Sequence, residues 1–192
     1  SAHNGWLASM NRRRQPAVGL TTLTAIVLRG QSYTLAHVGD TRAYLLRGGR
    51  LQLLTTDHVM AQRDFAHQLT RAMGLDDHVV VDYSQGELHS GDLLVLISDG
   101  VHGSLPEREL RQLLRADASA QALSDEITRA ALRRGSTDNV TALVVRVQGA
   151  LGRARYGQGG DGGLPAARLA RPRSAQPAPL LAWRHAGRSW RG

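Results

Sequence analysis

Short stretches of β-branched and aliphatic residues follow one another between Thr21 and Leu54, and each stretch ends at a glycine or an acidic turn. This pattern predicts strands over residues 21–29, 33–38, 42–47 and 51–54. The dipeptides Gly30-Gln31 and Gly48-Gly49 suit tight hairpins, and the links are too short to hold the helices that parallel crossovers need. This part of the chain is therefore predicted to be an antiparallel meander.

The following segments add strands and helices in separate blocks. Further strands are predicted over residues 78–84, 93–98 and 139–147, and helices over residues 106–115 and 119–134. Residues 93–97 are all aliphatic, which indicates a strand covered on both faces. Ahead of the strands, Trp6, Leu7 and Met10 share one helical face, which predicts the end of an amphipathic helix. Together the blocks indicate an α+β fold, an antiparallel β-sandwich flanked by helices.

The chain has 192 residues, which is enough for one domain with a sizeable core. It contains no cysteine, so disulfide frameworks, cysteine-based zinc sites and thiol nucleophiles are excluded. There is no run of about 18 apolar residues, and the first residues lack the apolar core of a signal peptide. We therefore expect a cytoplasmic monomer that has no membrane partner.

The positive charge of the chain is concentrated at its C-terminal end. Residues 149–192 carry +7 of the net charge of +8, from eight arginines and Asp161, while the other 16 arginines and 15 acidic residues nearly cancel. Residues 150–192 also show no periodicity and are rich in Gly, Pro, Ala and Arg, which predicts a disordered tail after a domain over residues 1–149. A nucleic-acid role for this tail ranks last, because its aromatic residues are limited to Tyr156, Trp183 and Trp190. No nucleic-acid partner is expected.

Three acidic residues stand in tight turns next to apolar strands, namely Asp40, Asp99 and Asp138. An aspartate in such a position is most often a simple turn former. Three of them at the ends of strands nevertheless predict a carboxylate cluster at one rim of the sandwich. Carboxylate oxygens without histidine or cysteine ligands select hard ions such as Mg²⁺ or Mn²⁺.

Six short motifs, in the same order along the chain, resemble the downstream motifs of the metal-dependent serine/threonine protein phosphatases of type 2C. They are Thr21-Thr22-Leu23-Thr24-Ala25, His37-Val38-Gly39-Asp40-Thr41-Arg42-Ala43-Tyr44, Leu54-Thr55-Thr56-Asp57-His58, Leu69-Thr70-Arg71-Ala72-Met73-Gly74, Ser98-Asp99-Gly100 and Thr137-Asp138-Asn139-Val140-Thr141. They extend over residues 19–147 and resemble the C-terminal two-thirds of that catalytic domain. The short link between the third and fourth motifs resembles bacterial members with a short flap, such as phosphatase domains that lie next to a kinase domain.

The resemblance implies a β-sandwich with a dinuclear Mn²⁺ or Mg²⁺ centre, which activates water to hydrolyse phosphoserine and phosphothreonine in proteins. By resemblance, Asp99 and Asp138 are ligands of the second metal, and Asp40 is a rim position that helps to hold a weaker third metal. No residue of the chain is assigned a covalent catalytic role. The implied partners are a phosphorylated protein substrate and a cognate serine/threonine kinase.

Three other side chains near the motifs have plainer interpretations. His37 lies inside a predicted strand and is expected to be packed rather than to act as a ligand. His102 either approaches the metal rim or lies in an exposed loop, and the exposed loop is favoured. Arg42, next to Asp40, is predicted to be a structural ion-pair partner.

The upstream motifs of the family have no match before Thr21. In the family these motifs supply a phosphate-binding arginine and the acidic residues that bridge the two metals. Asp161-Gly162-Gly163 is similar to one of them only superficially, because it stands in the wrong order. Two hypotheses follow: the parent protein is an active phosphatase, which Asp99 and Asp138 favour, or this chain is a catalytically incompetent remnant that binds or regulates a partner, which the missing motifs favour.

Overall fold

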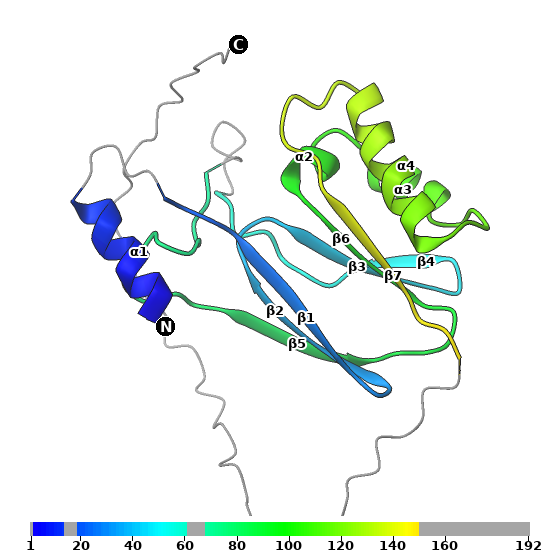
Figure 1. Cartoon of the computed structure of the whole chain (residues 1–192), viewed down its shortest axis with the longest axis horizontal. Helices are drawn as coiled ribbons and strands as arrows, with labels where there is room; N and C mark the ends of the chain where they lie inside the picture. The colour runs from blue at the N-terminus through cyan, green and yellow to red at the C-terminus, as the bar shows by residue number, and fades with distance from the viewer. Residues whose placement is uncertain (1, 14–18, 61–67, 150–192) are drawn as a thin grey trace, which may run out of the picture. The chain divides into compact units, whose positions relative to one another are not determined.

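The computed structural model describes residues 2–13, 19–60 and 68–149, and this part of the chain forms two antiparallel sheets and four helices (Figure 1). One sheet has the order β1-β2-β5 and the other has the order β4-β3-β6-β7. The strands are β1 (Leu23–Arg29), β2 (Ser32–Val38), β3 (Arg42–Arg47), β4 (Arg50–Leu53), β5 (Asp82–Glu87), β6 (Leu93–Ile97) and β7 (Ala142–Arg146). The helices are α1 (Ala2–Arg12), α2 (Asp99–His102), α3 (Glu107–Leu113) and α4 (Ala120–Arg133).

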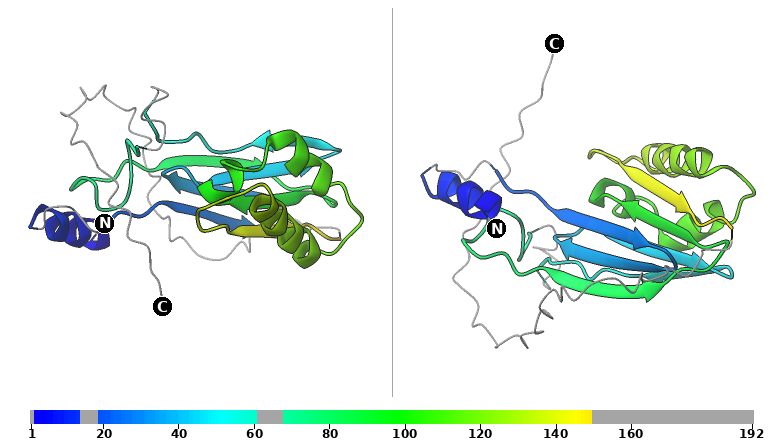
Figure 2. Two further views of the ribbon diagram at one scale, coloured as in Figure 1. Left: turned by 90° about the horizontal axis from the view of Figure 1, so that it is seen from above. Right: turned by 60° about the horizontal axis from the view of Figure 1, so that its bottom comes forward.

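The two sheets pack face to face, and their shared core is small and aliphatic. Tyr33 and Leu35 of β2 meet Ala43 and Leu45 of β3 there, and Leu94 of β6 joins them. The opposite face of the four-stranded sheet is covered by α3 and α4, which lie on the side away from β1, β2 and β5 (Figure 2). The predicted α+β sandwich flanked by helices is therefore confirmed.

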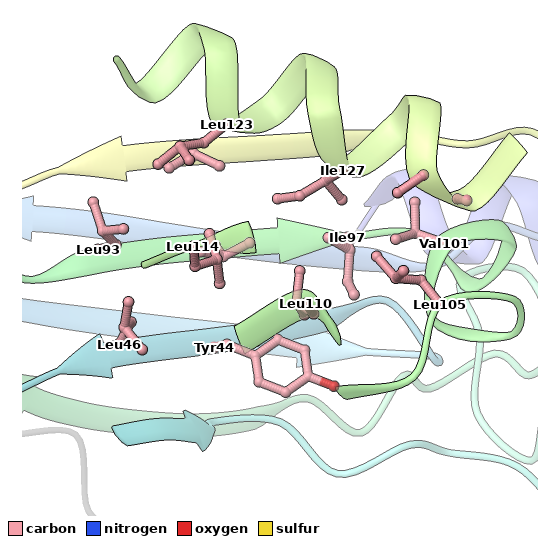
Figure 3. Close-up of a cluster of buried hydrophobic side chains, with 14 residues drawn as sticks. Tyr44, Leu46, Leu93, Ile97, Val101, Leu105, Leu110, Leu114, Leu123 and Ile127 are labelled. Carbon is pink, nitrogen blue, oxygen red and sulfur yellow. The ribbon is translucent and has the colours of Figure 1, made fainter. Parts of the chain in front are cut away.

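The second core lies between the four-stranded sheet and the helices (Figure 3). Leu123 and Ile127 of α4 point toward the sheet, and Leu110 of α3 packs beside them. Burying each of these side chains contributes about 1.5 to 3 kcal/mol. Residues 93–97 of β6 face both cores alternately, so the prediction that this strand is covered on both faces is confirmed.

The prediction of a single meander is corrected, because the chain changes sheets between β2 and β3. The strands β1 and β2 pair as a hairpin, and so do β3 and β4, but β2 pairs next with β5 and β3 pairs next with β6. The four central residues of β3 are all buried, so this strand needs a core on both of its faces. The four-stranded sheet offers both cores, because it packs against the three-stranded sheet on one face and against α3 and α4 on the other.

The predicted first helix is present, and Leu7 and Met10 are half-buried as expected, but Trp6 does not share in the burial of its apolar face. Trp6 is 64% exposed, and the buried residues of α1 are Asn4, Ala8 and Asn11. Asn4 Nδ2 donates to the carbonyl oxygens of Asp76 and Asp77 at 2.8 and 3.0 Å, and its Oδ1 accepts from the Gly74 amide at 2.9 Å. Hydrogen bonds between the Asn4 side chain and the backbone of residues 74–77 therefore hold α1 against that loop.

Several element boundaries also differ from the prediction. The fifth strand begins at Asp82 rather than at residue 78, and it continues to Glu87, which pairs with Ser32 of β2. The short helix α2 was not predicted. The predicted tail over residues 150–192 and the short-flap segment around residues 61–67 lie outside the described residues. In the described part of the chain, no helix combines the length and the apolar character needed to cross a membrane.

Candidate functional site

Three strand ends meet at one edge of the four-stranded sheet. The start of β3, the end of β6 and the start of β7 lie side by side, because Ile97 pairs with both Arg42 and Ala142. The turn before β3 carries Asp40, the residue that begins α2 directly after β6 is Asp99, and the loop before β7 carries Asp138. The fold therefore brings the three predicted carboxylates to one rim.

Asp40 and Asp99 influence each other electrostatically at this rim. Burial, and after it the negative charge of Asp99, raises the pKa of Asp40. Two carboxylates that repel each other in this way are stabilised when a cation is bound between them. The repulsion is therefore consistent with a cation site.

The turn that carries Asp99 packs directly against the loop that carries Asp138. A Cβ added to Gly100 would lie 2.4 Å from the carbonyl oxygen of Asn139 and 3.2 Å from Asp138 Cβ, so only glycine permits this approach. Ser136 Oγ also donates to the Gly100 carbonyl oxygen at 2.7 Å. The Oδ1 atoms of Asp99 and Asp138 accept from the amide of the next residue at 2.9 and 2.7 Å. Each carboxylate keeps a second oxygen for another partner.

His102 lies at the rim, so the favoured interpretation of it as an exposed-loop residue is wrong. Its Nε2 atom donates to the carbonyl oxygen of Asp40 at 2.9 Å. Burial, and after it the positive charge of Arg42, lowers the pKa of His102. Since its Nε2–H bond is directed at the Asp40 backbone, His102 supports the turn that carries Asp40.

Arg42 forms a structural ion pair, as predicted, and its partner is Asp57 rather than the neighbouring Asp40. Its Nε and Nη2 atoms donate to the Asp57 carboxylate at 2.8 to 3.1 Å. These hydrogen bonds are the main reason that the pKa of Arg42 is raised. The pair ties the start of β3 to the loop that follows β4.

Two buried histidines lie close together below the rim. His37 is 1% exposed and is bonded to Thr24 Oγ1 and to the Thr56 carbonyl oxygen, so its predicted packing role is confirmed. His58 is 2% exposed, and its ring centroid lies 4.8 Å from that of His37. The sequence pointed to His58 only as the last residue of a motif, because its main partner, Asp82, lies 24 positions away.

The rim suits a hard cation but does not enclose one. Carboxylate oxygens from Asp40, Asp99 and Asp138 are the donors that Mg²⁺ and Mn²⁺ prefer. Within residues 2–13, 19–60 and 68–149, no three His, Asp or Glu side chains are grouped closely enough to hold a metal ion. These residues fit one side of a metal site that needs further oxygen ligands.

Sequence comparisons show that the chain is similar to phosphatases. Residues 6–148 match the family described as Stage II sporulation protein E (SpoIIE). A serine/threonine phosphatase, Stp, of Listeria welshimeri is 31% identical over 140 residues, which covers 65% of this chain and 56% of the relative. The serine/threonine protein phosphatase PstP of Mycobacterium tuberculosis is 32% identical over 142 residues, covering 66% of this chain and 27% of the relative. The chain thus spans about half of the length of the Listeria relative.

Solved structures show the same fold. PppA of Pseudomonas aeruginosa, a regulatory component of its type VI secretion system, is 31% identical, with a TM-score of 0.71 over 74% of this chain and 64% of that one. The PstP catalytic domain in complex with two manganese ions is 30% identical, with a TM-score of 0.64 over 73% and 65%. The chain therefore belongs to the Stage II sporulation protein E (SpoIIE) family and is a relative of the bacterial type 2C serine/threonine phosphatases.

Proposed function

We propose that this chain contributes one side of the metal centre of a phosphatase that hydrolyses phosphoserine and phosphothreonine in proteins. The observation that carries the proposal is the direct contact between the Asp99 turn and the Asp138 loop, at the rim where Asp40 also lies. The names of the Listeria and Mycobacterium relatives support the reaction class. A phosphorylated protein substrate, a cognate kinase and a cytoplasmic location complete the proposal.

Manganese is the proposed cofactor, and magnesium is the alternative. The solved structure of PstP with two manganese ions supports this choice. In this chain, Asp99 and Asp138 would hold one cation with their second carboxylate oxygens, and Asp40 would help to hold a separate, weaker cation at the same rim. A bound Mn²⁺ or Mg²⁺ supplies the Lewis acidity for the attack of water on phosphorus.

The residues around the rim serve to fix the direction of these carboxylates. Gly100 permits the close approach of the two loops. The Ser136 hydroxyl donates to the Gly100 carbonyl oxygen and so joins the Asp99 turn to the loop that carries Asp138. His102 holds the Asp40 carbonyl oxygen. Loops whose backbone is fixed in this way have less conformational entropy to lose when a cation binds.

A second candidate function is binding or regulation without catalysis. The described residues lack a grouping of three metal-binding side chains, which favours weak metal binding and little turnover by this chain alone. Two-metal hydrolysis needs both ions to clamp the attacking and the leaving oxygens. We infer that the 192-residue chain by itself has little activity.

Turnover of para-nitrophenyl phosphate by the 192-residue chain, measured with and without Mn²⁺, tests the proposed function. We expect low, Mn²⁺-dependent turnover that Asp138→Ala abolishes. The matched control is Asp117→Ala in the loop between α3 and α4, which should leave the turnover unchanged. Turnover that survives Asp138→Ala would exclude the proposed centre, and efficient turnover that this substitution abolishes would exclude the non-catalytic alternative.

A further inference from the structure

The backbone amide and the backbone carbonyl of Gly39 are both held by a single residue, His58. The His58 amide donates to the Gly39 carbonyl oxygen at 2.8 Å, and the Gly39 amide donates to His58 Nδ1 at 3.1 Å. Gly39 has a φ of +111°, and a Cβ added there would lie 2.3 Å from Thr22 Cγ2, so the turn also requires glycine. The residue that follows this clamped peptide is Asp40.

These hydrogen bonds determine the tautomer of His58. Because Nδ1 accepts from the Gly39 amide, the proton of the neutral ring must be on Nε2. Nε2 lies 3.0 Å from Asp82 Oδ2, which can only accept when the carboxylate is ionised. Arg71 Nη1 donates to Asp82 Oδ1 at 2.6 Å, which keeps that carboxylate charged and oriented. The His58 side chain is 1% exposed, whereas that of Asp82 is 43% exposed.

His37 restricts His58 from the other side. His37 uses the same tautomer, because its Nε2 donates to the Thr56 carbonyl oxygen at 3.1 Å while its Nδ1 lies 2.8 Å from Thr24 Oγ1. Burial, and after it the neighbouring His58, lowers the pKa of His37. Two adjacent imidazole rings therefore pack together under the Gly39 turn, with their centroids 4.8 Å apart.

We propose that His58 is a positioning residue for the metal rim, and that Asp82 sets the tautomer that lets it act. Asp40 is then fixed before its Cα by His58, whose amide donates to the Gly39 carbonyl oxygen and whose Nδ1 accepts from the Gly39 amide. It is fixed after its Cα by His102 Nε2 at 2.9 Å. The backbone on both sides of the Asp40 Cα is therefore held, which limits the directions that the Asp40 side chain can take. The link to metal binding rests on the proposed function, while the link to the Asp40 turn does not.

Two substitutions of similar polarity separate positioning from packing. In His58→Asn, the asparagine Oδ1 can take the position of the histidine Nδ1 and accept from the Gly39 amide. In His58→Gln, the longer side chain places its amide group near the position of Nε2, so the Gly39 amide loses its acceptor. His58→Asn should therefore keep the clamp and His58→Gln should lose it, although glutamine fills more of the buried space. If His58 only filled space, His58→Gln would preserve the Gly39 turn better than His58→Asn.

The first measurement is metal-free NMR on the 192-residue chain. We expect ring ¹⁵N shifts of His58 that report the Nε2–H tautomer, and a mixture of tautomers in Asp82→Ala. The amides of Gly39 and Asp40 should become more mobile in His58→Gln and should stay ordered in His58→Asn. Arg71→Gln, which removes the other partner of Asp82, should leave the tautomer unchanged. An Nδ1–H tautomer, or equal order of the Asp40 amide in both His58 variants, would overturn the proposal.

The second measurement is calorimetric titration of the same variants with Mn²⁺. Mutation of residues that support metal ligands commonly lowers metal affinity by about tenfold or more. We therefore expect His58→Gln and Asp82→Ala to weaken Mn²⁺ binding by about tenfold. The Mn²⁺ affinity of His58→Asn should stay close to that of the unchanged chain. Equal affinity for His58→Gln and His58→Asn would exclude a positioning effect on the metal. If Asp99→Asn also has no effect on Mn²⁺ binding, the proposed function fails, and the NMR comparison still decides the role of His58 at the Asp40 turn.

Discussion

Ser98 and Asn139 join the two loops that carry the candidate metal ligands. The Ser98 hydroxyl donates to the Asn139 carbonyl oxygen at 3.1 Å and accepts from the Thr141 amide at 3.0 Å. Ser98 occupies the N-cap position of α2 but makes no side-chain hydrogen bond to that helix. Instead, its hydroxyl joins the segment that carries Asp99 to the loop that carries Asp138.

The substitution Ser98→Ala is expected to destabilise the fold and to weaken Mn²⁺ binding. It removes two hydrogen bonds, each with a net contribution of about 0.5 to 1.5 kcal/mol, as urea unfolding would measure. Ser119→Ala is the matched control, because Ser119 Oγ caps α4 by accepting from the Ala122 amide at 3.1 Å. That cap contributes about 1 kcal/mol but lies away from the rim. Equal Mn²⁺ affinity in both variants would show that Ser98 does not orient the ligands.

The substitution Asn4→Ala is expected to lower the free energy of unfolding by about 2 to 4 kcal/mol, because it breaks three hydrogen bonds to the loop at residues 74–77 and leaves the buried Gly74 amide unpaired. Trp6→Ala on the exposed side of the same helix is expected to change stability by less than about 0.5 kcal/mol. Chemical denaturation of both variants provides the comparison. A larger loss for Trp6→Ala than for Asn4→Ala would mean that α1 packs through its aromatic face.

The ion pair between the buried Asp92 and the partly exposed Arg47 is expected to make the fold acid-sensitive. Burial alone would raise the pKa of Asp92, but hydrogen bonds from Arg47 at 2.7 and 2.9 Å and from the His89 amide outweigh it, and the pKa is lowered. A carboxylate with a lowered folded pKa stabilises the fold above its unfolded value of 3.8, and this contribution is lost as the pH falls through the folded pKa. Unfolding free energies measured from pH 6 to below pH 4 should therefore fall less steeply in Asp92→Asn than in the unchanged chain. Identical slopes would contradict this assignment.

Deleting residues 150–192 is expected to leave the thermal midpoint nearly unchanged. Among the described residues the final strand is β7, which ends at Arg146, and the buried Val147 after it belongs to the core between the sheets. The deletion removes eight arginines and one aspartate, so the net charge falls from +8 to +1 and salt-sensitive adhesion to anionic polymers should largely disappear. A marked fall in the midpoint would show that the tail packs on the domain.

Strand pattern and turn chemistry predicted most of the fold. The strand over residues 42–47 was predicted with its observed bounds, because a glycine pair closes it on one side and an acidic turn opens it on the other. The aliphatic run in β6 indicated its central place, since only a strand between two cores buries both faces. Local sequence did not indicate where the chain changes sheets, because that choice depends on which strand supplies the second core for β3.

The candidate site was predicted in part. The acidic turns indicated Asp40, Asp99 and Asp138, and the sheet register explains why they share a rim. The supporting contacts were missed because they join distant segments. Asp82 reaches His58 only when β5 pairs with β2, and His102 reaches Asp40 across 62 positions.

Calorimetric titration of the 192-residue chain with Mn²⁺, compared with Asp99→Asn and with Asp117→Asn as a matched control, tests the central claim most directly. The proposed centre holds a cation from one side only, and the charge count of such an oxygen site sets its affinity. We therefore predict weak binding that Asp99→Asn abolishes and that Asp117→Asn leaves intact. Tight Mn²⁺ binding that is unchanged in Asp99→Asn would contradict the assignment of the rim as the metal centre.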